Sequence, residues 1–230
     1  MNTVIINILC EGQTEERFVS KVMKPYLKDY GIVLKPRILL TSKKKNQRGG
    51  MINYSQAKRD VENWISENRN RKSETHYYTT MFDFYALPSD FPCMDEIEKY
   101  TDAYGKVSAV ERAMTEKFQV SNFVPYIQLH EFEALLFSDI SKIVDRFPKQ
   151  KRTITNLQKV LDGCNGNPEL VNTGRTTAPS KRITAVVGEG RYHKVQDGVN
   201  IACRIGIDVM MNKCRHFKEW IDNLIALSIC

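Results

Sequence analysis

The sequence lacks paired cysteines and histidines at metal-ligand spacing. Its six cysteines include no C-x-x-C pair, and its four histidines are scattered. Cys10 falls in a run that we expect to be a buried strand, so the cysteines are interpreted as reduced thiols rather than as a disulfide framework or a zinc site. Cys214-x-His216 is the nearest approach to a metal clip, and it is a weak one.

Long apolar runs and phosphate-loop spacing are also absent. No segment is long and apolar enough to span a bilayer, and the first residues lack the basic lead and the length of a signal peptide. No spacing matches a P-loop, so no ATP site is predicted. We therefore expect a cytoplasmic protein without a membrane partner, while the oligomeric state is left open.

The composition is that of an ordinary globular chain. Of 230 residues, 42% are hydrophobic and 27% are charged, and this length can bury a sizeable core. The first apolar run, Thr3 to Cys10, is rich in β-branched residues and is typical of a strand buried on both faces of a parallel sheet. It ends in Glu11-Gly12, after which Thr14 and the acids beside it predict a capped helix.

Strands and helices alternate in the pattern that follows. We expect further strands over 35–41, 75–82 and 123–129, with helices between them, whereas the residues after 137 predict mostly helices. The sequence therefore predicts an α/β fold of the Rossmann-like kind, with a mostly parallel four-stranded sheet flanked by helices in residues 1–137. Residues 138–230 are expected to form a mostly helical C-terminal region packed on that domain.

Three of the expected strands end in acids: Glu11, Asp83, and the pair Glu131 and Glu133. The carboxyl ends of neighbouring parallel strands meet at one edge of a sheet, where ligands bind. Packed carboxylates repel one another, so a cation should lie among them. Mg²⁺ (or Mn²⁺) is the candidate, because hard cations prefer oxygen ligands and bridge to phosphates. Held there, such an ion is suited to phosphodiester cleavage.

Alternatives remain at each of these acids. Glu11 also fits a solvated loop acid beside a tight turn at Gly12. Glu131 and Glu133 point to the same side only if the strand continues through them; if the chain has turned helical, they diverge and at most one reaches the metal. The same segment also fits a plain helix cap followed by an apolar anchor.

Basic residues are unevenly distributed in a chain with a formal net charge of +7. One cluster precedes Gly49-Gly50, another lies at a predicted helix N-terminus, which is a common phosphate site, and a third position falls in a basic-aromatic loop. The side chains expected to contact nucleic acid are Lys43, Lys44, Lys45, Arg48, Ser180, Arg182 and Lys194. If the segment around Ser180 folds back over the acids, Lys181 would stabilise charge on a phosphate. The first cluster also fits a solvated loop, and the second also fits a helix N-cap with a solvated basic turn.

Several separated motifs resemble a bacterial family catalogued as domain of unknown function 4276. The motifs are Cys10-Glu11-Gly12-x-Thr14-Glu15, Asp83-x-Tyr85-x-Leu87-Pro88, His130-Glu131-Phe132-Glu133-Ala134-Leu135-Leu136-Phe137, Asn167-Pro168-Glu169, Ala178-Pro179-Ser180-Lys181-Arg182 and Tyr192-x-Lys194. The resemblance covers nearly the whole chain. The strand order and the leading Glu-Gly also look like the Toprim fold of topoisomerases, bacterial primases and the nucleases that accompany ATPases in phage-defence loci.

The Toprim resemblance implies roles for individual residues. Glu11 matches the glutamate that serves as general acid or base or as a metal ligand, and Asp83 matches the first aspartate of an Asp-x-Asp metal motif. Tyr85 replaces the second aspartate, and its neutral phenol is a poor ligand for Mg²⁺ at pH 7. Either Glu131 or Glu133 supplies the missing charge, or the protein binds without cutting.

The resulting expectation is a Mg²⁺-dependent nuclease, or a related phosphotransfer enzyme, that acts on DNA or RNA. Its catalytic residues would be Glu11, Asp83 and Lys181, and its metal ligands Glu11, Asp83, Glu131 and Glu133. The resemblance implies control by a partner ATPase and a role in phage defence. The alternative is a non-catalytic module that binds nucleic acid or that ATPase.

Overall fold

The computed structural model describes residues 3–42, 47–48, 53–68, 73–172, 174 and 177–228. The main sheet has the strand order β2-β1-β5-β6, and β7 also pairs with β5. Its strands are β1 (Thr3–Cys10), β2 (Ile32–Ile38), β5 (Glu74–Asp83), β6 (Phe123–Val124) and β7 (Ile127–Gln128). Each of these pairings is parallel. The predicted α/β fold with a mostly parallel sheet is confirmed.

The fourth strand position is divided, in contrast to the single strand expected over 123–129. Pro125 lies between β6 and β7 and has no N–H to donate to a ladder. The Thr80 hydroxyl of β5 bridges the gap, because it accepts a hydrogen bond from Tyr126 N at 2.9 Å and donates one to Tyr126 O at 3.0 Å. A side chain therefore keeps the two pieces in one register against β5.

The strand expected over 35–41 is wrong at both ends. β2 begins at Ile32, directly after Gly31, whose φ of +74° ends the preceding turn. Ile32 and Leu34 are buried on alternate positions, which is the strand period that defines this segment. Leu40–Ser42 forms β3, which pairs antiparallel with β4 (Gln47–Arg48) in a separate small sheet.

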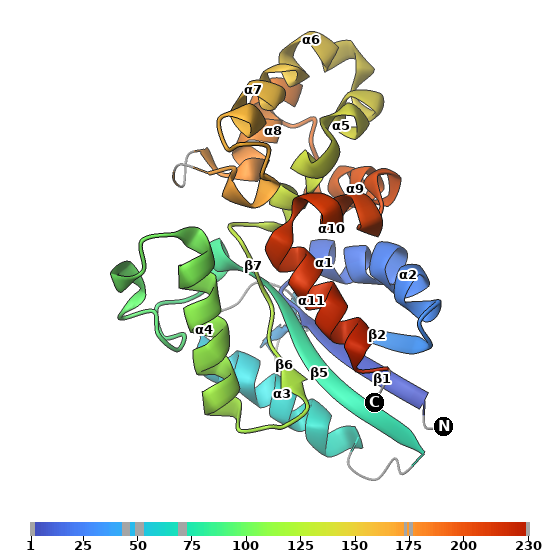
Figure 1. Cartoon of the computed structure of the whole chain (residues 1–230), viewed down its shortest axis with the longest axis vertical. Coiled ribbons are helices and arrows are strands. Elements are labelled where there is room, and N and C mark those ends of the chain that lie inside the picture. The colour runs from blue at the N-terminus through green and yellow to red at the C-terminus, as the bar shows by residue number, and fades with distance from the viewer. Residues whose placement is uncertain are drawn as a thin grey trace.

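Helices cover both faces of the main sheet (Figure 1). One face carries α3 (Tyr54–Asn68) and α4 (Ala103–Phe118); the other carries α1 (Gln13–Phe18), α2 (Lys24–Lys28) and α11 (Arg215–Ala226), with a π-helical turn, Val19–Met23, joining α1 to α2. Side chains of β1 alternate between the two cores, with Ile6, Ile8 and Cys10 in one and Leu9 in the other. The apolar run of β1 therefore reflects a strand covered on both faces.

The chain after β7 is mostly helical, as predicted. It contains a 3₁₀ segment, Phe132–Asp139, then α5 (Ile140–Arg146), α6 (Lys151–Ile154), α7 (Asn156–Asp162), α8 (Pro179–Val187), a π-helical turn, Lys194–Gly198, α9 (Val199–Ile205) and α10 (Ile207–Lys213). Helices α5 to α8 form a lobe beyond the carboxyl ends of β1 and β5 (Figure 1). The division into residues 1–137 and 138–230 stays a prediction.

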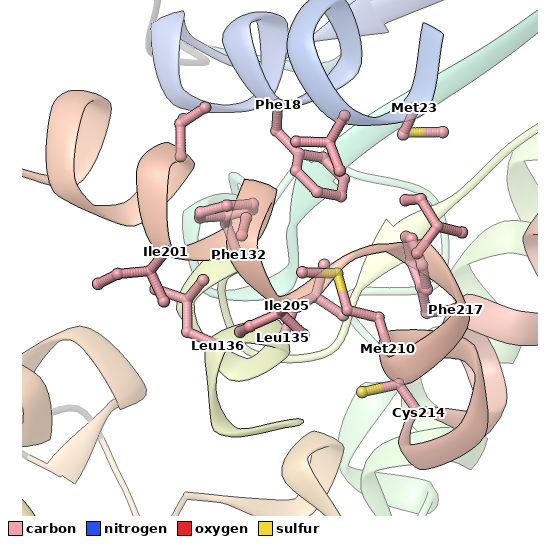
Figure 2. Close-up of a cluster of buried hydrophobic side chains, with 14 of the residues drawn as sticks. Phe18, Met23, Phe132, Leu135, Leu136, Ile201, Ile205, Met210, Cys214 and Phe217 are labelled. Atoms are coloured by element: carbon pink, nitrogen blue, oxygen red, sulfur yellow. The ribbon is translucent and has the colours of Figure 1, made fainter. Parts of the chain in front are cut away.

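One cluster of buried side chains joins this helical region to the sheet (Figure 2). The ring of Phe18 in α1 lies 5.1 Å from that of Phe132 and 6.2 Å from that of Phe217 in α11. Truncating a buried ring of this kind costs about 3–5 kcal/mol. Because Phe132 lies between Glu131 and Glu133, the packing in this cluster also fixes the backbone that carries those two acids.

The described cysteines are free thiols: Cys10, Cys93, Cys164, Cys203 and Cys214. Cys214 Sγ lies 3.4 Å from Ser138 Oγ, and His216 Nε2 lies 2.9 Å from Glu111 Oε1. Cys214 and His216 thus have separate partners rather than forming a metal clip. Within the described ranges, no helix combines the length and the apolar character needed to cross a membrane.

Candidate functional site

The carboxyl ends of β1 and β5 place Glu11 and Asp83 side by side. These strands are parallel neighbours at the centre of the sheet. The next strand in the chain, β2, lies on one side of β1, and the later strand β5 lies on the other. Ligands of open α/β sheets bind at such a point. Glu11 Oε2 accepts a hydrogen bond from Asp83 N at 3.1 Å, and Asp83 Oδ1 accepts one from Phe132 N at 2.9 Å. The loop after β7 therefore joins the same site.

Glu131 and Glu133 come from a tight turn rather than from a strand. β7 ends at Gln128, and the 3₁₀ segment begins directly after an extended Glu131, with φ −153° and ψ 161°. Both carboxylates nevertheless reach one cation, since Lys194 Nζ lies 2.8 Å from Glu131 Oε2 and 3.2 Å from Glu133 Oε2. The sequence left open whether the strand continues through both residues or turns helical. In the structure a turn starts between them, and both carboxylates still contact Lys194.

Lys194 is the positive group among these acids. It is the first residue of the π-helical turn Lys194–Gly198, and such turns are frequent at functional sites. Buried Asp197 fixes the turn: it accepts a hydrogen bond from His193 N at 2.8 Å and pairs with Arg146 at 2.6 Å. Contact of Lys194 with nucleic acid stays a prediction, and in the structure its ammonium group is paired with two carboxylates.

Hydroxyl groups complete the hydrogen bonding of the two glutamates. The Ser180 hydroxyl donates to Glu131 Oε1 at 3.0 Å, and the Tyr192 hydroxyl donates to Glu133 Oε1 at 3.2 Å. Lys194 occupies the second oxygen of each carboxylate. Glu131 and Glu133 therefore have a donor on every oxygen.

A pocket of about 340 Å³ lies at this edge of the sheet. Its lining includes Glu11, Asp83, Tyr85, Ser180, Lys181 and Lys194. Among the described residues, Glu11 Oε1 and Asp83 Oδ2 have no hydrogen-bond donor. Lys181 is exposed in the first turn of α8. The oxygens left for a ligand in this pocket, which we call the acidic pocket, are therefore those of Glu11 and Asp83.

Several carboxylates share this buried place, and their pKa values rise as a result. Burial raises the pKa of Asp83 well above its usual range, and the charges of Glu15, Glu11 and Glu133 raise it further. Burial also raises the pKa of Glu11, and it raises that of Glu133 to about 7 against the opposing charge of Lys194. The positive charge of Lys194 thus offsets only part of the cost of ionising these acids.

Glu131 is the exception among them. Burial acts to raise its pKa, but the charge of Lys194 and hydrogen bonds from Lys194 and Ser180 outweigh burial and lower the pKa. Burial acts to lower the pKa of Lys194, whereas Glu133 and Glu131 raise it above its ordinary value. Glu131 and Lys194 therefore form an ion pair at neutral pH.

Glu15 is a member of this group that the sequence reasoning did not assign to the site. Its carboxylate accepts a hydrogen bond from Gly12 N at 2.9 Å, and Gly12, rather than Thr14, is the N-cap of α1. Burial, with a contribution from Glu11, raises the pKa of Glu15 to about 7. The spacing Gly12-x-x-Glu15 is that of a capping box and was the available signal.

The structure places the residues predicted to bind nucleic acid in different surroundings, and some of them lie outside the described residues. Lys43, Lys44 and Lys45 lie outside the described residues, and of Arg48 only the backbone, in β4, is described. Arg182 Nε donates to Thr177 O at 2.8 Å, so this guanidinium group is tied to the segment before α8. Ser180 and Lys181 line the acidic pocket.

The acids of the pocket suit a divalent cation that takes only some of its ligands from the protein and the rest from water or substrate. Among the described residues, no three Asp, Glu, His or Cys side chains are arranged to hold a metal ion, so a closed protein cage is absent there. Mg²⁺ is commonly held by one or two carboxylates while it keeps waters and binds substrate phosphate. The available oxygens of Glu11 and Asp83, beside a cavity, match that mode.

Comparison with known proteins identifies a family. Residues 10–225 match the family model described as Domain of unknown function (DUF4276). No curated protein and no solved structure matches the chain.

Proposed function

The chain thus belongs to the DUF4276 family, and we propose that it is a Mg²⁺- or Mn²⁺-dependent nuclease, or a related phosphotransfer enzyme, that acts on nucleic acid. The acidic pocket is the observation that carries this proposal. Glu11 and Asp83 offer oxygens for a cation, and the first turn of α8 adds Ser180 and Lys181 at the same cavity. Acids for a metal beside a basic helix N-terminus suit the cleavage of a phosphodiester. The Toprim resemblance of the motifs adds support.

Each residue then has a definite task. Glu11 and Asp83 would hold the cation with the carboxylate oxygens that no described donor uses. When bound, the ion supplies the positive charge that polarises a phosphoryl oxygen. Lys181 and the N–H groups at the start of α8 bind the phosphate oxygens. Lys194 neutralises part of the charge of Glu131 and Glu133, which limits their repulsion of the phosphate.

A basic groove at the other end of α8 favours a polymer over a free nucleotide as substrate. This cavity of about 490 Å³ is lined by Lys149, Arg152 and Arg191, with one acid, Glu189. Val187, at the C-terminal end of α8, also lines it, and the rise of a helix puts it roughly 10 Å from Ser180. A strand of a few nucleotides spans that distance, and its phosphates suit both cavities.

A cleavage assay on the wild type and on Glu11→Gln tests the proposal. The substrates are single-stranded and double-stranded DNA and RNA, each with Mg²⁺, with Mn²⁺ and with EDTA. We expect the wild type to cut only with a divalent ion. The cleavage rate of Glu11→Gln should be lower by roughly a hundredfold or more, because a charged carboxylate that holds the metal becomes a neutral amide. Thermal melting should show that the variant is folded.

The matched control is Glu16→Gln in α1. The Glu16 carboxylate accepts a hydrogen bond from Ser20 at 2.9 Å, and it is not among the residues that line the acidic pocket. This variant should cut like the wild type. If the wild type cuts none of the substrates with either ion, the enzymatic proposal fails.

The second candidate is a non-catalytic module that binds nucleic acid or a partner ATPase. Two observations favour it: Lys194 already pairs with two of the acids, and Tyr85 stands where the Toprim motif has its second aspartate. Such a module would bind an oligonucleotide equally well with Mg²⁺ and with EDTA and would not cut it. Lys149→Glu should weaken this binding, more strongly at low salt.

A further inference from the structure

We infer that a second pocket, adjoining the acidic pocket, binds one unstacked nucleobase of the strand whose phosphate lies at Glu11 and Asp83. The inference rests on the proposed action on nucleic acid and adds the form of the substrate. Tyr85 lines both pockets. Base and phosphate are neighbouring parts of one nucleotide, so two pockets that share one wall residue fit one nucleotide unit. We call the second cavity the base pocket.

The size and lining of the base pocket suit a flat heterocycle. Its volume is about 220 Å³, which is below the roughly 300–1,000 Å³ of pockets for drug-sized ligands. Phe84 and Tyr85 are partly buried and contribute aromatic rings, and Leu129 contributes an apolar surface. Stacking of bases on aromatic side chains is the usual way in which proteins hold single strands.

His130 forms part of the wall of the base pocket. Its φ of +63° is uncommon for a residue other than glycine, and its ring lies 5.3 Å from that of Tyr85. Tyr85 N donates to His130 O at 3.1 Å. The strained backbone thus holds two rings of the pocket together, as strain often does at functional sites.

Polar groups of the pocket suit the edge of a base. Asn172 Oδ1 accepts a hydrogen bond from Gly174 N at 2.8 Å, and Asn172 Nδ2 lies 3.3 Å from His130 Nδ1. An amide nitrogen carries two hydrogens. Among the described residues Asn172 Nδ2 has only the contact with His130, which leaves one hydrogen for a carbonyl oxygen of a base. The exposed Thr101 also lines the pocket and adds a hydroxyl group.

This arrangement gives Tyr85 a task at the position of the missing aspartate. Its ring forms the wall between the phosphate and the base, so it acts as a positioning residue rather than as a metal ligand. A base inside this pocket cannot be stacked in a duplex. The substrate is therefore a single strand, or a duplex from which one base has been turned out.

The test is a binding measurement by fluorescence anisotropy. It uses the full-length Glu11→Gln variant, which should bind the strand without cutting it. The probes are a labelled oligodeoxythymidylate, the same strand with abasic sugars, and a duplex that contains the same strand. We expect the abasic strand and the duplex to bind about tenfold more weakly, in line with the loss of one stacked base. Equal affinity for all three probes overturns the inference and leaves the proposed function standing.

The remaining outcomes separate the two proposals further. Binding that depends on bases, without any cutting by the wild type, supports the base pocket and overturns the nuclease. A lack of binding to every probe overturns the base pocket together with any nucleic-acid function. Displacement of the labelled strand by phenylalanine amide but not by thymidine monophosphate would assign the pocket to a peptide side chain and overturn the inference.

Variants locate the effect in this pocket. Phe84→Ala should abolish the tenfold preference for the base-containing strand, whereas Phe84→Tyr, which keeps the ring, should retain it. Lys149→Glu in the basic groove is the matched control. It should lower the binding affinity of all three probes by the same factor. Melting curves check that Phe84→Ala is folded. If it is not, the comparison of the base-containing and abasic strands with Glu11→Gln, which keeps the base pocket unchanged, still tests the inference. A preference that survives Phe84→Ala in folded protein contradicts the assignment.

Discussion

The carboxylate of Glu169 and those of the acidic pocket are held in different ways. Glu169 is fully buried, and every one of its oxygens is used by the fold: Oε2 accepts from the Tyr104 hydroxyl at 2.9 Å and from His216 N at 3.0 Å, and Oε1 accepts from Phe217 N at 2.9 Å. The two N–H groups belong to the first turn of α11. The carboxylate therefore satisfies unpaired donors and complements the helix dipole.

The acidic pocket has the opposite character. Its carboxylates lie near one another, and Glu11 and Asp83 line a cavity with oxygens that no described donor uses. The pKa of Asp83 is raised by burial and by the charges of the neighbouring acids. The difference separates a structural acid from one available to a ligand. The motif Asn167-Pro168-Glu169 is thus explained by folding, although it stands among the family motifs beside the acids of the pocket.

The largest effect expected from this comparison is that of Glu169→Ala on stability. The substitution leaves two buried backbone N–H groups of α11 and the partly buried Tyr104 hydroxyl without an acceptor, at a cost of about 4 kcal/mol. Urea unfolding measures the loss. Glu219→Ala in the same helix, which removes an exposed pair with Arg215, should change stability by less than about 1 kcal/mol. Similar losses for the two variants would contradict the structural assignment of Glu169.

The acidic pocket should make stability fall as pH rises. In the folded protein the pKa values of Glu15 and Glu133 are about 7, against 4.5 for an unperturbed glutamate. Since the folded state binds these protons more tightly, their contribution is complete below about pH 4.5 and is lost as pH rises through about 7. We expect a loss of up to about 3 kcal/mol for each of these two glutamates in buffer without divalent ions, measured by urea unfolding at successive pH values.

His130 opposes this trend in the lower part of that window: its pKa is lowered to about 4, so its contribution to stability grows as pH rises to about 6.5, and the net fall is expected above that pH. Glu67 and Glu131 have lowered pKa values, so their contributions change only below about pH 4.5. Mg²⁺ added at high pH should restore stability if Glu11 and Asp83 hold it, because an ion that binds only the folded state stabilises it. The free energy of unfolding is measured against pH for the wild type and for Glu133→Gln. If it does not change with pH in either protein, the electrostatic description of the pocket is contradicted.

Lys194→Met should have an intermediate effect that depends on pH. The variant removes the cation between Glu131 and Glu133, and we expect a loss of about 2 kcal/mol at high pH, reduced because the side chain is partly exposed. The loss should shrink at low pH, where the glutamates take up protons. Lys213→Met, at an exposed position of α10, is the control. A loss that is independent of pH would show that packing, rather than charge, is at stake.

The smallest expected effect is that of Gly198→Ala. The φ of Gly198 is −58°, so its backbone accepts alanine, but the added Cβ would lie 2.8 Å from the Tyr192 hydroxyl and 3.4 Å from Phe132. Moving Tyr192 weakens its hydrogen bond to Glu133, and we expect a cost of about 1 kcal/mol. Thermal melting of the variant measures this cost. Gly163→Ala, where φ is −63° and the nearest contact of the added Cβ is 3.4 Å, should melt like the wild type.

Local patterns predicted much of the fold. The apolar, β-branched run of β1 and the aromatic run of β5 identified the two central strands, and their parallel pairing brings Glu11 and Asp83 together. The fourth strand was less predictable, because Pro125 interrupts a run whose composition is otherwise that of a strand. The arrangement of Glu131 and Glu133 was not predictable either, since the start of a 3₁₀ segment shows no clear period in the sequence.

The sequence by itself determined the α/β class and the placement of acids at strand ends, because hydrophobic period and β-branched content are local properties of a chain. Only the tertiary structure decided which group faces these acids. Lys194 is 63 residues from Glu131, and its position depends on the π-helical turn that Asp197 and Arg146 hold in place. A salt bridge between such distant segments leaves no periodic trace in the sequence, since it arises only when separate elements pack.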